Sequence, residues 1–338
     1  MDQRKERILR AVVSDYTETV IPVGSHALAA RYFLELSSAT IRNELSELVD
    51  DGFLAQPHAS AGRIPTDRGY RYFVDFLLPQ EVVEPGVRRQ VRQGFESAGH
   101  DVEAVLEMAA AVLSRLSDNV AVVTGPASNA CRVRHVDLVL VHPGQALLVE
   151  IATGNAAYQH QVEVDPELDQ EDLSSLAAHL NRLYQGRSPE EVEAELPGPD
   201  QPVGLGALAA ELARGLRHLQ ERSALVIHDG VRNLVRQPEF GDPARLGAVL
   251  EVLEAQRLLA DVLVQLAPQV GMQVVIGHEN AIEELRECSL VLTSYQAGEQ
   301  VWGTIGVVGP TRIRYGQVAA RLQLVSQATG AALTRLMA

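Results

Sequence analysis

Three short helical patterns and two short apolar runs occupy the first 72 residues of the chain. Amphipathic spacing predicts helices over 4–16, 26–32 and 39–50, with a turn or a proline between them. Ser38 is placed to cap the third helix, and Gly52 to end it. The runs at 53–56 and 63–65 then flank a tip of small residues, which indicates a hairpin. This order predicts a winged helix-turn-helix.

The third predicted helix turns its polar face away from an apolar stripe of Ile41, Leu45 and Leu48. The side chains that we expect to read base edges are Ser38, Thr40, Arg42, Asn43 and Ser46. Arginine pairs bidentately with guanine and asparagine with adenine, and each pair contributes about 1–3 kcal/mol of discrimination. The positive end of the helix dipole, at the N-terminus of this predicted helix, favours a nearby phosphate. This face predicts DNA recognition.

The chain is acidic, with a formal net charge of −15, so its whole surface cannot attract nucleic acid. Residues 1–75 hold nine Lys and Arg against eleven Asp and Glu. Within them, Arg63, Arg68 and Arg71 are accompanied by one acid, Asp67. We expect these three arginines to bind the DNA backbone or enter the minor groove. Any affinity for DNA would then come from a local patch.

The rest of the chain predicts an α+β fold in which β patterns surround a mostly helical stretch. Strands are predicted at 120–124, 136–141, 146–151, 273–276, 290–295, 301–308 and 312–315. Helices are predicted at 102–116, 168–184, 189–196, 208–219, 243–266 and 318–336. Asp229-Gly230 indicates a further hairpin between 224–227 and 231–235. One domain inserted in another fits this order, and so does a simple succession of domains.

Enzymatic and metal chemistry find no support in the motifs. The histidines lack metal-ligand spacing, and His278-Glu279 has no second histidine to form a zinc helix. The glycines at 204–206 imitate a dinucleotide fingerprint, but no strand precedes them. We therefore expect no catalytic residues, no metal and no cofactor. Cys131 and Cys288 are expected to be buried free thiols.

No apolar run approaches the roughly 20 residues that a membrane-spanning helix needs. The N-terminus is charged and lacks the apolar stretch of a signal peptide. These two features predict a cytoplasmic protein with no membrane partner.

Two contiguous motifs resemble the HrcA family of heat-inducible transcription repressors. The first is SSATIRNEL at 37–45, followed by LVDDGFL at 48–54. The second is QPHASAGRIPTDRGYR at 56–71. A looser resemblance includes GTIGVVGPTR at 303–312, whereas 165–247 matches the family only in general character.

The resemblance implies a winged helix-turn-helix at 1–78 and a linker with the start of a helix at 79–101. It implies a GAF-like α/β domain at 102–164 plus 248–338. A mostly helical dimerisation domain with a small antiparallel sheet would be inserted at 165–247. The implied protein is a homodimer that binds double-stranded DNA at an inverted-repeat operator and represses chaperone and chaperonin operons. Its activity would depend on the chaperonin GroEL, which unfolded proteins occupy under heat, so that repression is relieved.

Three other functions fit parts of the sequence. The N-terminal helices and hairpin are also typical of protein-docking modules. A GAF-like domain can hold a small molecule, and Trp302, Tyr295 and Met272 are candidates to line its pocket, although core packing is the better interpretation. A pure oligomerisation scaffold would need none of the exposed polar residues of the third helix.

Overall fold

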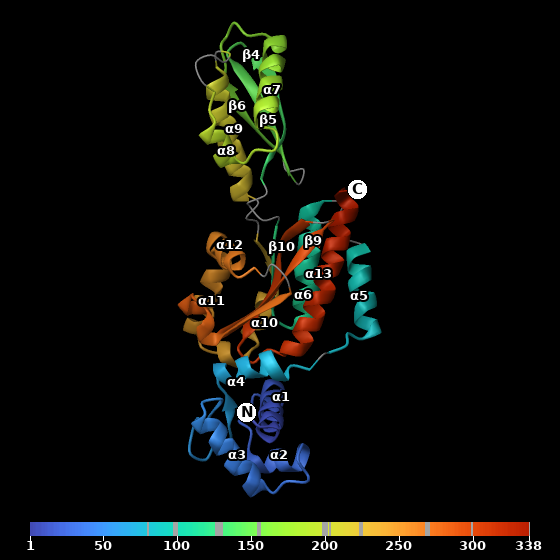
Figure 1. Cartoon of the computed structure of the whole chain (residues 1–338), viewed down its shortest axis with the longest axis vertical. Coiled ribbons are helices and arrows are strands. Elements are labelled where there is room, and N and C mark those ends of the chain that lie inside the picture. The colour runs from blue at the N-terminus through green and yellow to red at the C-terminus, as the bar shows by residue number, and fades with distance from the viewer. Residues whose placement is uncertain are drawn as a thin grey trace. The chain divides into compact units, whose positions relative to one another are not determined.

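The computed structural model describes the chain except for residues 80, 97–100, 126–130, 154–156, 198–201, 203, 223–225, 268–270, 299 and 338. Helices and small antiparallel sheets make up its elements, which confirms the α+β class (Figure 1). The chain forms two compact units, one of Met1–Thr124 with Val226–Ala338 and one of Gly125–Leu225. Because the first unit is discontinuous in sequence, the second is inserted into it, and a simple succession of domains is excluded.

Residues 1–66, which we call the head, contain three helices and a two-stranded sheet. The elements are α1 Gln3–Thr19, α2 Ser25–Arg31, α3 Ser38–Asp50, β1 Leu54–Ala55 and β2 Ile64–Pro65. Their apolar faces bury one common set of side chains, which includes Ile8, Val12, Leu28, Ile41, Leu45 and Leu48. The helical periodicity of the sequence therefore identified the face of each helix that packs inward.

A five-stranded antiparallel sheet lies at the centre of the remainder of the first unit, in the order β7-β3-β10-β9-β8. Its strands are β3 Val120–Thr124, β7 Val226–Asp229, β8 Met272–Ile276, β9 Cys288–Ala297 and β10 Gln300–Pro310. Two long helices, α6 Val102–Ser117 and α13 Tyr315–Met337, pack on this sheet (Figure 1). Gly330 permits close packing of α13, because a Cβ at Gly330 would lie 2.0 Å from the carbonyl oxygen of Gln296. We call the sheet and these two helices the sheet core.

Shorter elements connect the head and surround the sheet core. They are α4 Asp67–Tyr72, η1 Phe73–Leu77, α5 Pro85–Glu96, α10 Val231–Val235, η4 Pro238–Phe240, α11 Pro243–Glu254, α12 Gln256–Gln265, η5 Gly277–Glu279 and η6 Glu283–Leu285. Among the described helices, none combines the length and the apolar character needed to cross a membrane.

The hairpin predicted at 224–235 is wrong. Val226–Asp229 does form a strand, but it pairs with β3, and Ala121 is the register partner of Asp229. Gly230 adopts a φ of +88° and begins the helix α10 instead of a return strand. The Asn233 amide donates a hydrogen bond of 3.1 Å to the carbonyl oxygen of Asn119, which holds that helix beside β3. Long-range pairing has thus overridden the local Asp-Gly turn signal.

Two smaller predictions are also corrected. The single helix expected over 243–266 is two helices, α11 and α12, because the backbone of Ala255 leaves the helical region. The strand expected at 312–315 is a turn that leads into α13.

The second unit, Gly125–Leu225, has its own sheet and its own apolar core. Its elements are β4 Val133–His142, β5 Gln145–Ala152, β6 Ala157–Glu163, α7 Gln170–Tyr184, α8 Pro189–Ala194 and α9 Leu205–Arg222. The strands predicted at 136–141 and 146–151 are β4 and β5, and they pair antiparallel. Leu138 and Leu148 lie opposite each other and are buried in one cluster with side chains of α7 and α9.

The bounds of this unit differ from the 165–247 expected for the inserted domain. Strands β4 to β6 were assigned to the GAF-like part, but their buried face packs on α7 and α9, so the insertion begins near 125. At its other end, β7 joins the five-stranded sheet, and residues from 226 onward belong to the first unit. Periodicity predicted β4 and β5 but missed β6, and it gave no information about which helices cover the sheet.

Candidate nucleic-acid interface

Helix α3 begins at Ser38, one residue earlier than predicted, because Ser37 is its N-cap. The Ser37 backbone is extended, and its Oγ accepts a hydrogen bond of 3.1 Å from the N–H of Thr40. The same Oγ lies 2.9 Å from the Thr40 hydroxyl. The prediction that Ser38 caps the helix is therefore wrong, and Ser38 instead stands exposed in the first turn.

The exposed face of α3 gathers the predicted base-reading residues. Ser38, Arg42, Asn43 and Ser46 are exposed, whereas Thr40 is half-buried. Ser46 donates a hydrogen bond of 3.0 Å to the carbonyl oxygen of Arg42, so its hydroxyl is partly engaged within the helix. Arg42 and Asn43 therefore present the longest polar side chains on this face.

Glu44 and Glu47 of α3, and its C-cap Asp51, are paired with cations of α1. Arg4 lies 3.3 Å from Glu44, and Lys5 lies 2.7 Å from Glu47 and 3.7 Å from Asp51. The hydrogen bond to Glu47 raises the pKa of the Lys5 ammonium above its usual range. These pairs reduce the negative potential that α3 would otherwise present to an approaching phosphate.

The hairpin after α3 is closed at its base and at its tip. At the base, Val23 and Arg63 exchange two backbone hydrogen bonds of 2.8 Å. Gly62 is required there, because a Cβ would lie 2.4 Å from the carbonyl oxygen of Pro22. At the tip, the Gln56 amide donates to the carbonyl oxygens of Ala59 and Ala61. The tip itself, residues 57–60, is exposed.

The three arginines predicted to bind DNA do not lie in one patch. Arg63 is half-buried; its guanidinium donates to the carbonyl oxygen of Ala61 at 3.3 Å, and its Nε is buried with no partner among the described residues. Arg68 is exposed, and its guanidinium carbon lies 4.7 Å from the centre of the Phe53 ring, a cation–π distance. Arg63 lies in the hairpin and Arg68 in the first turn of α4, and both are compatible with a contact to DNA.

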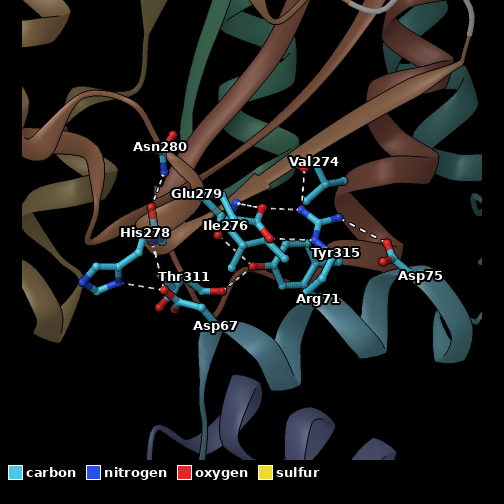
Figure 2. Close-up of polar contacts among 12 residues, drawn as sticks. Asp67, Arg71, Asp75, Val274, Ile276, His278, Glu279, Asn280, Thr311 and Tyr315 are labelled. Atoms are coloured by element: carbon cyan, nitrogen blue, oxygen red, sulfur yellow. Dashed lines mark hydrogen bonds and ion pairs between the residues drawn. The ribbon is translucent and has the colours of Figure 1, made fainter. Parts of the chain in front are cut away.

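Arg71 has a different environment, on α4 against the sheet core (Figure 2). Its guanidinium binds the Glu279 carboxylate through two hydrogen bonds of 2.8 and 2.5 Å. It also donates to the carbonyl oxygen of Val274 at 2.7 Å and to Asp75 at 3.2 Å. These four bonds use the guanidinium donors that a phosphate would need, so the expectation that Arg71 binds the DNA backbone is not supported.

A second contact joins the first turn of α4 to the same edge of the sheet core. The Asp67 carboxylate accepts hydrogen bonds from the backbone N–H of His278, at 2.9 Å, and from its Nδ1, at 2.8 Å (Figure 2). Behind these polar contacts, the buried rings of Tyr70 and Tyr315 lie 5.8 Å apart.

Comparison with known proteins identifies the family. A family model described as "HrcA protein C terminal domain" matches residues 103–319. The heat-inducible transcription repressor HrcA of Desulforamulus reducens is 35% identical over 342 residues, which cover 100% of this chain and 98% of the relative. The protein of the same name from Moorella thermoacetica is 34% identical, and the match covers 99% of this chain and 99% of the relative.

The chain belongs to the HrcA family of heat-inducible transcription repressors. The resemblance carried by the motifs at 37–54 and 56–71 is thereby confirmed. A crystal structure described as that of a hypothetical protein also matches, with a TM-score of 0.60, 22% identity, and coverage of 99% of this chain and 98% of that one. At that identity, the match supports the fold alone. The relatives in this family are named as transcription repressors and not as enzymes.

The sequence of this HrcA-family chain gave no sign of the contact between α4 and the sheet core. Arg71 and Glu279 are separated by 208 positions, and His278-Glu279 had been considered only as half of a zinc motif. In the described part of the chain, no group of three or more His, Cys, Asp or Glu side chains is arranged to hold a metal ion. Both cysteines are buried and free, and burial raises the pKa of Cys131 to about 11 and that of Cys288 to about 12.

The residues considered for a small-molecule pocket are not gathered around one. Tyr295 is buried, and its hydroxyl donates a hydrogen bond of 2.6 Å to the carbonyl oxygen of Thr124, so it packs within the sheet core. Met272 lies at a groove of about 660 Å³ beside α13, together with glycine, serine, threonine and glutamine residues. The side chain of Trp302 lies outside the described residues.

Proposed function

We propose that this chain represses chaperone and chaperonin operons by binding an inverted-repeat operator as a homodimer. In this proposal, the head is a winged helix-turn-helix and α3 is its recognition helix. The observation that carries it is the exposed face of α3, where Arg42 and Asn43 are exposed. Glu44 and Glu47 of the same helix are paired with Arg4 and Lys5. Bound to chromosomal operators, the protein would act in the cytoplasm.

Each side chain of the proposed interface has one of two roles. Ser38, Thr40, Arg42, Asn43 and Ser46 would face base edges in the major groove, which is where base pairs can be told apart. Arg63, from the hairpin that serves as the wing, and Arg68, from the first turn of α4 beside it, would contact the backbone or the minor groove. Arg71 is left out of this surface because its donors are used within the chain.

Dimerisation is proposed to occur through the inserted unit, Gly125–Leu225. One face of its sheet packs on α7 and α9, and the other face carries apolar side chains that remain accessible. Val139 is 44% exposed and Val141 39%, while Leu147, Val149 and Ile151 are half-buried. A second copy of the same face is the occupant that we propose, because an inverted repeat requires two heads related by a two-fold axis.

The sheet core is proposed to be GAF-like, with its antiparallel sheet backed by α6 and α13. We assign it no ligand. Its proposed role is to carry the head, together with α4, in a fixed orientation.

Relief of repression is proposed to follow titration of the chaperonin GroEL by unfolded proteins. A repressor that needs a chaperonin must have a small free energy of folding. A difference of a few kcal/mol then decides whether the form that binds DNA or the form that does not is populated. One feature that supports a narrow margin is Glu150, a fully buried carboxylate in the inserted unit with no hydrogen-bond partner among the described residues. Burial of an unpaired carboxyl reduces the stability of a fold.

A gel-shift experiment on the chaperonin promoter of the source genome tests the proposal. The full chain should shift the promoter fragment, and a fragment with a scrambled inverted repeat should not be shifted. Mild heating should abolish the shift, and chaperonin with ATP should restore it. Binding that ignores the scrambled repeat would contradict operator recognition, and binding that survives heating without chaperonin would contradict the titration mechanism.

A further inference from the structure

Helix α4 is fixed to the hairpin at its first turn. Thr66, the residue after β2, accepts a hydrogen bond of 3.1 Å from the N–H of Gly69 through its side chain and so caps the helix. The same hydroxyl lies within hydrogen-bond distance of the carbonyl oxygens of Gly52 and Phe53, at 2.7 and 3.1 Å. The hairpin and α4 are therefore joined through one side chain, and we expect them to move as one body.

The opposite side of α4 meets a turn of the sheet core that is itself rigid. The turn is η5, and it is held from within by Asn280, whose buried amide donates to the carbonyl oxygens of Gly277, Leu285 and Cys288. Glu279 also accepts a hydrogen bond of 2.9 Å from the backbone N–H of Ile276. The Glu279 carboxylate, which accepts the hydrogen bonds of Arg71, is thus oriented by contacts within the sheet core and not by α4.

Gly277 shows how closely the two surfaces fit. Its φ is +51°, and a Cβ built on it would lie 2.3 Å from a carboxylate oxygen of Asp67. Any side chain at this position would push Asp67 away from the backbone N–H of His278. The closeness of this contact indicates a defined docking geometry.

Apolar side chains also join the head to the sheet core, because α1 and Tyr70 share one buried cluster with Ile313 and Tyr315. The described residues between η1 and α5, which are 78, 79 and 81–84, form no helix or strand. The Tyr70–Tyr315 packing would remain, but apolar contact is non-directional. The hydrogen-bonded pairs therefore supply the directional part of this contact.

We propose that a clamp of Asp67 and Arg71 on α4 with His278 and Glu279 on η5 positions the head on its own sheet core. In a dimer, this clamp would fix the direction of each α3 helix on its own sheet core and so restrict the spacings between operator half-sites that both heads can bind. In this proposal the four residues are positioning residues that act through the head and make no contact with DNA. The inference rests on the proposed binding of an inverted repeat by a dimer.

A rigid link and a loose link differ in a measurable way. When the first head is bound, a rigidly held second head has a high effective concentration at the other half-site, but only if the spacing matches. A loosely held second head gains less affinity from the second half-site and accepts a wider range of spacings. Contact of one head with one half-site is made by α3 and the wing alone. Loosening the clamp should therefore leave half-site binding intact and weaken binding to the full operator.

The test compares Arg71→Gln, Glu279→Gln and His278→Ala in the full chain, with Glu283→Gln as the matched control. Glu283 is a neighbouring exposed carboxylate that pairs only loosely with Arg286, at 3.9 Å. Affinities are measured for a single half-site and for inverted repeats whose spacer is changed one base pair at a time. Both glutamine variants should lose about tenfold or more on the optimal repeat, keep half-site affinity within about twofold, and show a flatter dependence on spacer length.

Glu279→Gln separates the clamp from a DNA contact, because loss of a negative charge cannot weaken a phosphate contact. If Arg71→Gln alone weakens binding, equally on half-site and full operator, and lowers the salt slope by about one, then Arg71 binds phosphate and the clamp is wrong. An unchanged spacer preference in all three variants would also overturn it. His278→Ala removes an imidazole that is 79% exposed, so it tests the Asp67 contact with little risk to folding.

Failure of the proposed function would look different. In that case the unmodified chain would show no preference for an inverted repeat over a half-site, before any variant is compared.

Discussion

Single side chains on α3 determine how well the proposed interface can distinguish sequences. Arg42 and Asn43 are neighbours on the exposed face, and both have side chains that can form paired hydrogen bonds with one base. Glu44 and Glu47 are held by Arg4 and Lys5 on α1. We therefore expect recognition by this helix to depend on Arg42 and Asn43 more than on the net charge of α3.

We expect Arg42→Ala and Asn43→Ala each to weaken operator binding by about 10- to 100-fold, because each removes a contact that contributes about 1–3 kcal/mol of discrimination. Binding to a scrambled fragment should fall much less. Arg89→Ala is the control, since Arg89 is an exposed arginine of α5 outside the proposed interface. Fluorescence anisotropy with both fragments measures this difference. Full activity of the Arg42→Ala, Asn43→Ala double variant would favour an oligomerisation scaffold.

Arg63 is expected to contribute affinity without sequence preference. Arg63→Ala should weaken binding to all fragments and reduce the slope of log affinity against log salt by about one unit. A salt titration of the variant beside Arg89→Ala, an exposed arginine of α5, provides the comparison. Loss confined to the specific operator would show that Arg63 reads bases.

Glu150 is a fully buried acidic residue of the inserted unit. It lies on β5 with its carboxylate against Gly215 of α9 and 3.7 Å from the His160 ring, and His160 in turn lies 3.3 Å from Glu211. Burial, reinforced by the charge of Glu211, raises the pKa of Glu150 to about 9. At neutral pH the folded unit therefore holds this carboxyl protonated, whereas the unfolded chain ionises it.

A raised pKa in the folded state gives stability at low pH that is lost as the pH rises. Between the ordinary value of 4.5 and the folded value of about 9, the free energy of unfolding should fall by about 1.4 kcal/mol per pH unit from this group. Glu150→Gln should remove that slope and raise the unfolding temperature at pH 8 while changing little at pH 4. Thermal unfolding followed by circular dichroism from pH 4 to 9 measures it. Parallel curves for the two proteins would show that Glu150 does not titrate as described.

At the scale of elements, capping decides where the recognition helix starts. The cap is Ser37, whose Oγ accepts the Thr40 N–H, and not Ser38. Ser37→Ala should lower the free energy of unfolding by about 1 kcal/mol and loosen the first turn of α3. Ser38→Ala should affect operator binding but not stability. Urea unfolding of the two variants distinguishes them, and equal stability losses would contradict the assignment of the cap.

Local elements could be predicted from the sequence, and their partners could not. Helical periodicity located α1, α3 and α6, because the spacing of apolar residues that forms the buried stripe is local to each segment. The failed hairpin at 224–235 shows the limit: Asp229-Gly230 favours a turn, but β3 competes for the same strand. For the candidate site, the exposed face of α3 followed from 100° spacing. The partners of Arg71 did not, since nothing local to Arg71 indicates Glu279.

At the scale of the whole molecule, the proposed dimer depends on the open face of the three-stranded sheet. Val139 and Val149 lie on adjacent strands of that face. Val139→Glu together with Val149→Glu should convert the protein to a monomer, because burial of two carboxylates against a second copy is unfavourable. Sedimentation at micromolar concentration measures the mass. Leu183→Glu, an exposed apolar position on α7, is the control, and a dimer that persists in the sheet variant would place the interface elsewhere.

The insertion has a consequence for engineering. Thr124 and Val226 are register partners in an antiparallel pair, so their Cα atoms lie about 5 Å apart, and the whole of Gly125–Leu225 takes the place of a hairpin loop between β3 and β7. If Asn-Gly, the dipeptide suited to a two-residue turn, replaces this unit, β3 and β7 should still pair in the five-stranded sheet. The shortened protein, without Gly125–Leu225, would be a small repressor with a single head. Any dimeric domain whose two ends lie equally close together could be inserted at the new turn between β3 and β7.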